Sequence, residues 1–158
     1  MQKKILVIGN GGREHALVDA LHRSPQKPEI YNFATAVNPG IKELCSEVYI
    51  GDITSPTEVT HYAQKIQPQF AIIGPENPID AGIVYALQEV HIPSFGPSKQ
   101  CARLESSKSF TRNLLQKYNI DASPSFSVFH SKEEISKRKS FFDQFHGAIV
   151  VKADGLIG

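Results

Sequence analysis

A glycine-rich segment, Gly9-Asn10-Gly11-Gly12-Arg13, follows a short apolar run near the start of the chain. Because glycine lacks a Cβ, backbone N–H groups in such a segment can approach an anion closely, and a helix that begins there adds a favourable dipole. Arg13 can add a bidentate contact to a phosphate group. We therefore predict that Gly11, Gly12 and Arg13 bind a phosphate-bearing ligand. The alternative is a tight strand-to-helix turn that binds nothing.

A nicotinamide or flavin dinucleotide is the obvious rival ligand for this segment. The dinucleotide fingerprint has a third glycine, where this chain has Glu14, and an acidic residue after the second strand, which holds the ribose hydroxyls. The segment expected to form that strand, Tyr31-Asn32-Phe33-Ala34-Thr35, contains no acidic residue. The sequence therefore disfavours a dinucleotide.

Two further polar segments follow expected strands, Gly74-Pro75-Glu76-Asn77-Pro78 and Asn38-Pro39-Gly40. In parallel α/β sheets, ligands bind in a crevice at the carboxyl ends of the strands. Glu76 is suited to sugar hydroxyls or an amine there, and Asn38 is expected to face the same crevice. Each segment is otherwise explained as a proline-containing turn.

Two lysines are candidates for a second anion site. We expect Lys108 in the first turn of a helix, where a cation is unfavourable unless an anion is nearby. Lys152 ends an apolar run just before Ala153-Asp154-Gly155. The alternative is that either side chain lies along apolar surface with its ammonium group in water.

Nothing in the sequence predicts a metal site. The six histidines form no pair at ligand spacing, and Cys45 and Cys101 are far apart. We expect both cysteines to be buried, reduced thiols, as is usual in reducing compartments.

The elements that must position these residues alternate between strands and helices. Continuous apolar runs at Ile5–Ile8 and Phe70–Ile73 predict strands covered on both faces. Residues 29–35 and 47–50 are weaker candidate strands. Helical spacing groups the apolar residues of three further segments: Ala16, Leu17, Ala20 and Leu21; Val59, Tyr62, Ala63 and Ile66; and Ile79, Ile83, Ala86, Leu87 and Val90. This order predicts a doubly wound α/β domain with a parallel sheet, a Rossmann-like architecture.

The pattern changes near residue 100. Helices are expected over 99–105, from 106 to 118 and over 131–145, and strands over 126–129 and 148–151. We predict one domain over residues 1–103 and the start of a second over 104–158. An apolar strand at 148–151 needs partners that the remaining residues do not supply, so we expect the chain to be the front part of a longer protein.

Composition excludes several classes of protein. The 158 residues are 41% hydrophobic with a net charge of +1, which gives no basic surplus for nucleic acid. Apolar runs such as Ile5-Leu6-Val7-Ile8 are too short for a membrane span or a signal peptide. We expect a cytoplasmic protein without nucleic-acid or membrane partners.

Four blocks of the sequence resemble the N-terminal part of phosphoribosylamine–glycine ligase, an ATP-grasp enzyme family of purine biosynthesis. The blocks, in the order and spacing of the family, are Val7-Ile8-Gly9-Asn10-Gly11-Gly12-Arg13-Glu14-His15-Ala16-Leu17; Gly74-Pro75-Glu76-x-Pro78 with Ala81-Gly82-Ile83-Val84; Phe95-Gly96-Pro97-Ser98 with Ala102-Arg103-Leu104-Glu105-Ser106-Ser107-Lys108-Ser109-Phe110; and Val150-Val151-Lys152-Ala153-Asp154-Gly155-Leu156. The chain departs from the family at Ala36-Val37-Asn38-Pro39-Gly40, which lacks a usual proline and glycine, and at Ser106, where glycine is usual.

The resemblance implies a pre-ATP-grasp domain followed by the incomplete start of an ATP-grasp domain. It implies that ATP, with magnesium, phosphorylates glycine and that 5-phosphoribosylamine attacks the glycyl phosphate, giving glycinamide ribonucleotide, ADP and phosphate. Gly11, Gly12, Arg13, Asn38 and Glu76 would then line the phosphoribosylamine site.

In the same resemblance, Lys108 and Lys152 would hold the ATP phosphates. The family's metal and glycine ligands lie beyond Gly158, so the remainder of the enzyme is missing, no catalytic residue is assigned, and the chain alone is expected to be inactive. Two alternatives stay open: the front domain of another ATP-grasp enzyme, such as a carboxylase, and a non-catalytic domain that binds a small molecule.

Overall fold

The computed structural model describes residues 2–156. The chain divides into two compact units between Arg103 and Leu104. We call these the N-terminal unit and the C-terminal unit and describe each by itself.

The N-terminal unit is built on a parallel sheet of five strands in the order β3-β2-β1-β4-β5. The strands are β1 (Lys4–Ile8), β2 (Glu29–Ala34), β3 (Glu47–Ile50), β4 (Phe70–Ile73) and β5 (Ser94–Phe95). The first four confirm the predicted strands. The sequence missed β5 because a two-residue strand leaves no apolar run to detect.

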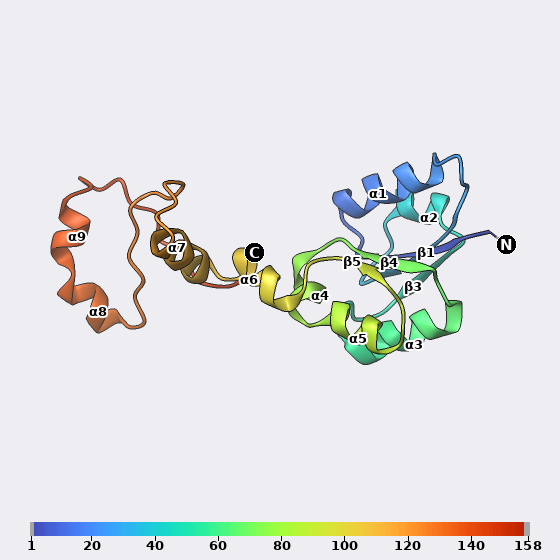
Figure 1. Ribbon diagram of the computed structural model, residues 1–158. Coiled ribbons are helices and arrows are strands. Elements are labelled where there is room, and N and C mark those ends of the chain that lie inside the picture. The colour runs from blue at the N-terminus through green and yellow to red at the C-terminus, as the bar shows by residue number, and fades with distance from the viewer. Residues whose placement is uncertain (1, 157–158) are drawn as a thin grey trace. The chain divides into compact units, whose positions relative to one another are not determined.

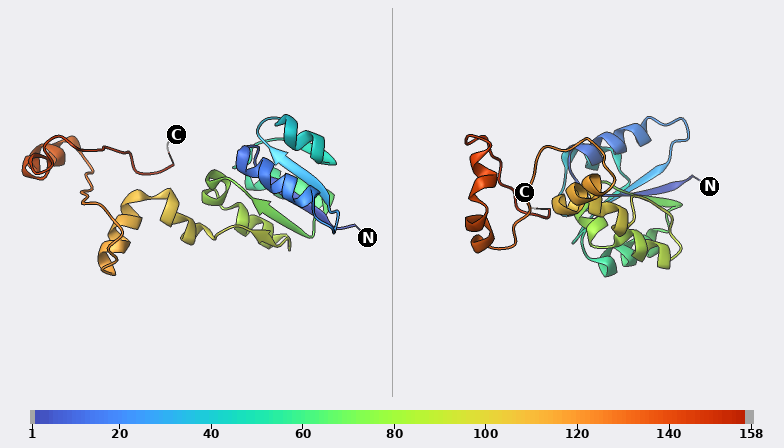
Figure 2. Two further views of the ribbon diagram at one scale, coloured as in Figure 1. Left: turned by 90° about the horizontal axis from the view of Figure 1, so that it is seen from above. Right: turned by 60° about the vertical axis from the view of Figure 1, so that its left-hand side comes forward.

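Helices cover both faces of the sheet, which confirms the predicted doubly wound α/β fold. The helices of this unit are α1 (Gly12–His22), α2 (Pro39–Leu44), α3 (Pro56–Ile66), α4 (Glu76–Asp80) and α5 (Ile83–Glu89). Helices α1 and α2 lie on one face, and α3 and α5 lie on the other (Figure 1). The view from above shows α1 in front of the strands and running roughly along them (Figure 2).

The position of β1 between two apolar cores explains why its sequence is apolar without interruption. Leu6 and Ile8 join the core under α3 and α5, whereas Ile5 and Val7 join the core under α1 and α2. Because successive side chains of a strand point to opposite faces, a strand covered on both sides must be apolar at every position. This central strand ends directly at the glycine-rich segment.

Helix α1 buries a different face from the one predicted. Ala16, Leu17 and Ala20 are exposed, whereas Glu14 and Val18 are buried. These two residues are four apart and lie on one side of the helix. The prediction from the apolar pattern is wrong here because the buried side chain of the first turn, Glu14, ends in a carboxylate.

The stripe predicted from Ile79 to Val90 is buried or partly buried, as expected, but it belongs to two helices. Helix α4 ends at Asp80 and α5 begins at Ile83. Between them Gly82 has a φ of +90°, in the left-handed region that glycine adopts without strain.

Helix α2 stands where the sequence indicated only a turn. The Asn38 side chain caps it by accepting a hydrogen bond from the Gly40 N–H at 3.0 Å, and Pro39 occupies the first helical position. Asparagine at the capping position and proline at the first helical position both favour the start of a helix.

The C-terminal unit is helical where it is regular. Helix α6 (Lys99–Ser106) spans the division, and it is followed by α7 (Lys108–Lys117), α8 (Lys132–Lys137) and α9 (Lys139–Asp143). Helices were predicted in all of these places, although the predicted helix over 131–145 is two shorter ones.

The strands predicted at 126–129 and 148–151 are wrong, because neither segment is a strand. Val150 and Val151 are 79% and 85% exposed. A strand requires a neighbour that accepts and donates its backbone hydrogen bonds, and no described residue pairs with either segment.

Both cysteines are free thiols, as predicted, but only Cys45 is partly buried, so the expectation of burial is wrong for Cys101, which is exposed. Burial raises the pKa of Cys45 to about 11. No helix among residues 2–156 is both long and apolar enough to cross a membrane.

Candidate functional site

The sheet order reverses at the carboxyl ends of β1 and β4, and we call the space beside these two strand ends the crevice. From β1 the chain adds β2 and then β3 on one side, and it returns to place β4 on the other side. Such a reversal between neighbouring strands is where open α/β sheets bind ligands. Two segments meet there: the glycine loop, which we define as residues 9–13, and the β4–α4 junction, which we define as residues 74–76.

Gly11, Gly12 and Arg13 are exposed at this edge of the sheet. Gly9 has a φ of +114°, which allows the chain to turn from β1 into α1. The Gly11 N–H already donates a hydrogen bond to Glu14 Oε2 at 2.6 Å, so this amide is satisfied within the chain. The first-turn N–H groups of α1 have no acceptor within the helix and point toward its N-terminus.

Asn38 lies against the glycine loop. Its Nδ2 donates to the Asn10 carbonyl oxygen at 3.0 Å, while its Oδ1 caps α2. Thr35 adds a hydrogen bond from its hydroxyl to Asn10 Oδ1 at 3.1 Å. Asn38 therefore fixes the position of the loop relative to the segment after β2, and contact with a ligand stays a prediction.

Arg13 and Glu76 form an ion pair across the crevice. Arg13 Nη2 lies 2.6 Å from Glu76 Oε1, and the two side chains are 64% and 28% exposed. The pair joins the glycine loop to the β4–α4 junction. A guanidinium carries five N–H donors in a fixed plane, a geometry that suits bidentate contact with a phosphate.

Sequence reasoning did not assign a role to Asn32 or Glu14, the two polar residues buried in the core. Asn32 Nδ2 donates to the carbonyl oxygens of Val7 and Gly9, at 2.9 and 2.8 Å. It thus fixes the end of β1 and the first residue of the glycine loop. An asparagine inside an otherwise apolar strand was the signal that could have identified it.

The C-terminal unit holds the other candidate residues. Lys108 begins α7, as predicted, and its Nζ donates to the Gly155 carbonyl oxygen at 2.7 Å. Asp154 accepts hydrogen bonds from the hydroxyls of Ser107 and Ser109 and, at 3.2 Å, from the Ser109 N–H. The start of α7 therefore binds the segment that contains Lys152, which is exposed.

This network should be visible in a titration of Asp154. Its hydrogen bonds from Ser109 hold the pKa of Asp154 at about 2, below its usual range. Because the folded pKa is lowered, the contact stabilises the unit above the usual carboxyl pKa and is lost as pH falls toward 2. We expect Ser109→Ala to raise the pKa of Asp154 toward 3.8, measured by NMR of its side-chain carboxyl carbon.

Ser136→Ala is the control, because the Ser136 hydroxyl donates instead to the Lys132 carbonyl oxygen. A Ser109→Ala protein with an unchanged Asp154 titration would show that the network does not persist in solution.

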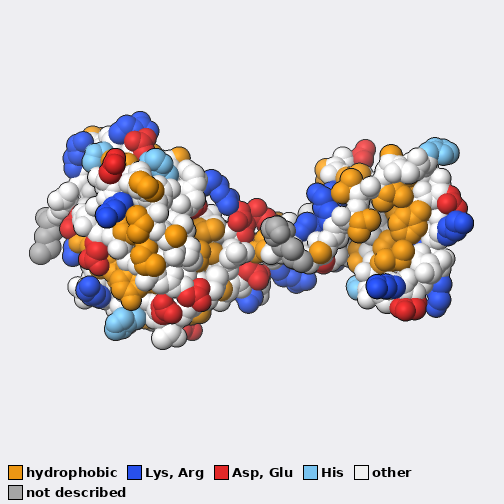
Figure 3. Space-filling model, turned by 180° about the vertical axis from the view of Figure 1, so that it is seen from behind, with side chains coloured by type: hydrophobic (Ala, Val, Ile, Leu, Met, Phe, Trp, Pro, Cys, Tyr) orange, Lys and Arg blue, Asp and Glu red, His pale blue; other side chains and the backbone are white. Residues whose placement is uncertain are grey.

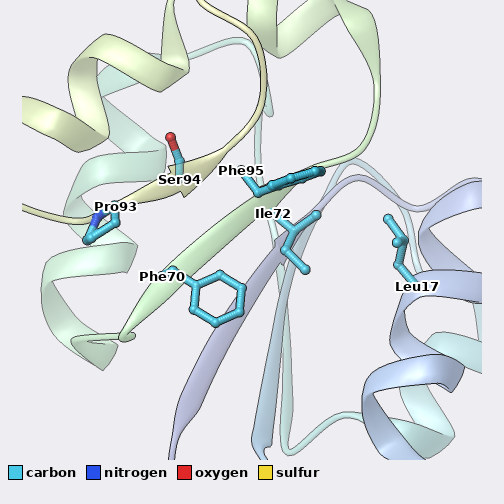
Figure 4. A pocket seen from close by; sticks show the side chains of 6 residues that line it. All are labelled: Leu17, Phe70, Ile72, Pro93, Ser94 and Phe95. Carbon is cyan, nitrogen blue, oxygen red and sulfur yellow. The ribbon is translucent and has the colours of Figure 1, made fainter. Parts of the chain in front are cut away.

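A groove elsewhere in the N-terminal unit is not suited to a phosphate. This groove, of about 480 Å³, is lined by Leu17, Phe70, Ile72, Pro93, Ser94 and Phe95 (Figure 4). No charged residue lines it, so a phosphate would not be stabilised there. On the face shown in Figure 3, charged side chains of both signs are interspersed with apolar ones and form no basic stripe.

No group of three or more possible metal ligands occurs within residues 2–156. The glycine loop offers a guanidinium and backbone N–H groups, and Lys108 and Lys152 offer ammonium groups. Groups of these kinds bind anions.

The α/β fold of this chain is similar to part of several solved synthetases. The crystal structure of phosphoribosylglycinamide synthetase from Anaerococcus prevotii has a TM-score of 0.60 and 18% identity, covering 89% of this chain and 35% of that one. N5-carboxyaminoimidazole ribonucleotide synthetase from Thermotoga maritima has a TM-score of 0.67 and 12% identity, covering 97% and 45%. At these identities the likeness concerns the fold alone.

The family follows from the sequence match. The model of the phosphoribosylglycinamide synthetase N domain matches residues 3–105, and the chain belongs to this family. Phosphoribosylamine–glycine ligase of Methanosarcina acetivorans is 37% identical over 158 residues, and that of Methanococcus maripaludis (strain C7) is 40% identical over 158 residues. The chain spans 35% of the length of each of these relatives.

Proposed function

We propose that the N-terminal unit is the phosphoribosylamine-binding part of a phosphoribosylamine–glycine ligase. The observation that carries this proposal is the joining of Arg13 to Glu76 across the crevice, beside the exposed N-terminus of α1. A phosphate and an amine on one small sugar call for a cation with N–H donors and for a carboxylate within one site. The crevice supplies both.

In this proposal each residue has a distinct task. Arg13 and the first-turn N–H groups of α1, including that of Gly12, bind the phosphate, and Gly11 gives the loop its shape. Glu76 accepts hydrogen bonds from the ribose hydroxyls or the amine. Asn38 holds the loop in place. These contacts orient the amine, which is the nucleophile, and orientation contributes much of the rate in such a reaction.

The C-terminal unit would contribute to the ATP site. One N–H of the Lys108 ammonium is used by Gly155, which leaves two for phosphate oxygens. Lys152, on the segment bound to α7, would supply a second positive charge. The two lysines neutralise negative charge as the γ-phosphate passes to the glycine carboxylate.

The overall reaction in this proposal balances as an ATP-dependent ligation. The glycine carboxylate takes the γ-phosphoryl group and releases ADP. The sugar amine then attacks the glycyl carbonyl carbon, an amide bond forms, and phosphate leaves with the proton going to water. No group of three or more possible metal ligands occurs within residues 2–156, so we route no step through magnesium and assign no catalytic residue here.

The test is formation of glycinamide ribonucleotide from ATP, glycine and 5-phosphoribosylamine, followed by mass spectrometry. We expect the full-length protein that contains these residues to make the product, with one ADP for each product molecule. We expect the 158-residue chain alone to make none, because it spans only 35% of the length of the ligases it resembles.

The assay includes the Methanococcus maripaludis ligase as a positive control. Product from the 158-residue chain alone would contradict the expected inactivity of that chain. A full-length protein that is inactive where the control is active would overturn the proposed function, and turnover of bicarbonate in place of glycine would favour a carboxylase.

A further inference from the structure

Glu14 is a buried carboxylate at the edge of the proposed phosphate site. It is 3% exposed and lies in the first turn of α1, directly after Arg13. Charged side chains are almost never buried to this extent without a partner. The proposed function gives Glu14 no task, so its burial requires a separate explanation.

The Glu14 carboxylate binds the glycine loop. Its Oε2 accepts the Gly11 N–H at 2.6 Å, a short hydrogen bond to an ionisable acceptor. Oε1 is buried and has no hydrogen-bond partner among residues 2–156. The contact with Gly11 therefore fixes one side of the carboxyl group, and the other side lies against the β4–α4 junction.

The path of this side chain explains why residue 74 is a glycine. A Cβ placed on Gly74 would lie 2.1 Å from Glu14 Oε1 and 2.5 Å from Glu14 Cγ, distances that real structures do not tolerate. A Cβ on Gly9 would lie 2.8 Å from Pro75 Cδ and 2.9 Å from Glu14 Cγ, and its φ of +114° already favours glycine. Gly74 has no positive φ, so space for Glu14, and not backbone conformation, requires a glycine there.

We infer that Glu14 is the positioning residue of the proposed phosphate site. It holds the Gly11 N–H and passes between the ends of β1 and β4, so that the glycine loop and the β4–α4 junction keep one spacing. In a dinucleotide turn a third glycine occupies this position and lets the helix approach the strand. Here Glu14 fills that space, and Gly74, directly after the neighbouring strand β4, leaves room for the Glu14 side chain. The inference rests on the proposed function.

The test compares the dissociation constant for ribose 5-phosphate with the exchange rate of the Gly11 amide in variants of the full chain. We expect Glu14→Ala to weaken ribose 5-phosphate binding at least tenfold and to speed Gly11 exchange, because the loop loses its anchor. Glu14→Gln keeps an oxygen that can accept the Gly11 N–H, so it should recover most of the affinity. Asp19→Asn is the control, since it removes a half-exposed carboxylate from the same helix.

Gly74→Ala tests the same contact from the other side and replaces Glu14→Ala if that variant does not fold. It should displace Glu14 and weaken binding, whereas Gly96→Ala should not, because a Cβ on Gly96 meets its nearest atom at 3.4 Å. In the full-length ligase, these changes should raise KM for phosphoribosylamine and leave KM for ATP unchanged.

If Glu14 only stabilised the fold, its variants would have a lower melting temperature and an unchanged dissociation constant for ribose 5-phosphate. Folded Glu14→Ala or Gly74→Ala protein that binds ribose 5-phosphate within twofold of the wild type would overturn the inference alone. Wild-type protein that does not bind ribose 5-phosphate would overturn the proposed function and this inference with it.

Discussion

Replacing Arg13 by alanine is expected to weaken ribose 5-phosphate binding by roughly ten- to a hundredfold. A hydrogen bond to a charged group contributes about 1.5–3 kcal/mol, and about 1.4 kcal/mol corresponds to a factor of ten. The fold should be little affected, because the side chain is 64% exposed and an exposed ion pair contributes about 0–1 kcal/mol. Calorimetric titration of the variant measures the affinity, and thermal unfolding checks the fold.

Arg23→Ala is the matched control for this prediction. Arg23 follows the same helix, is 69% exposed and pairs with Asp19 across one helical turn, yet it lies at the end of α1 away from the crevice. We expect Arg23→Ala to bind ribose 5-phosphate as the wild type does. In the full-length ligase, Arg13→Ala should raise KM for phosphoribosylamine far more than KM for ATP. Equal affinities in the Arg13→Ala and Arg23→Ala proteins would remove Arg13 from the site.

Asn32→Ala should destabilise the protein more than an exposed substitution can. Asn32 is fully buried, and its amide serves the carbonyl oxygens of Val7 and Gly9. A buried acceptor left without its donor costs about 1–3 kcal/mol, and the cavity adds to this, so we expect a loss of about 2–4 kcal/mol. Urea unfolding measures the change in free energy.

Gln64→Ala is the control for Asn32→Ala, because it removes an amide from the exposed side of α3. Its free energy of unfolding should stay within about 0.5 kcal/mol of the wild type. A loss below about 1 kcal/mol in Asn32→Ala would show that the end of β1 does not depend on Asn32.

The strands that carry the candidate site could be predicted because their burial leaves a simple pattern. The residues of β1 alternate between two apolar cores, so the run Ile5–Ile8 has no polar position, and the same holds for Phe70–Ile73. Parallel strands with their loops at one edge then bring Arg13 and Glu76 together without any detail of packing. This part of the account required only periodicity and the rule for α/β crevices.

The failures have equally specific causes. The buried face of α1 was predicted wrongly because the buried residue of its first turn is Glu14. The burial of Glu14 depends on Gly74, sixty residues later in the sequence. A pattern of hydrophobicity contains no information on such a contact. The strands expected at 126–129 and 148–151 have apolar residues but no partner strand among the described residues. Strand propensity alone does not supply the hydrogen bonds of a sheet.

One titration tests the central claim, that the crevice between β1 and β4 binds a sugar phosphate. Ribose 5-phosphate is added to the ¹⁵N-labelled chain, with ribose alone and inorganic phosphate alone as comparisons. We predict saturable shifts of the Gly11, Gly12 and Arg13 amides with ribose 5-phosphate, weaker shifts with phosphate and none with ribose. Unchanged amides at these three residues, or equal shifts with all three compounds, would contradict it.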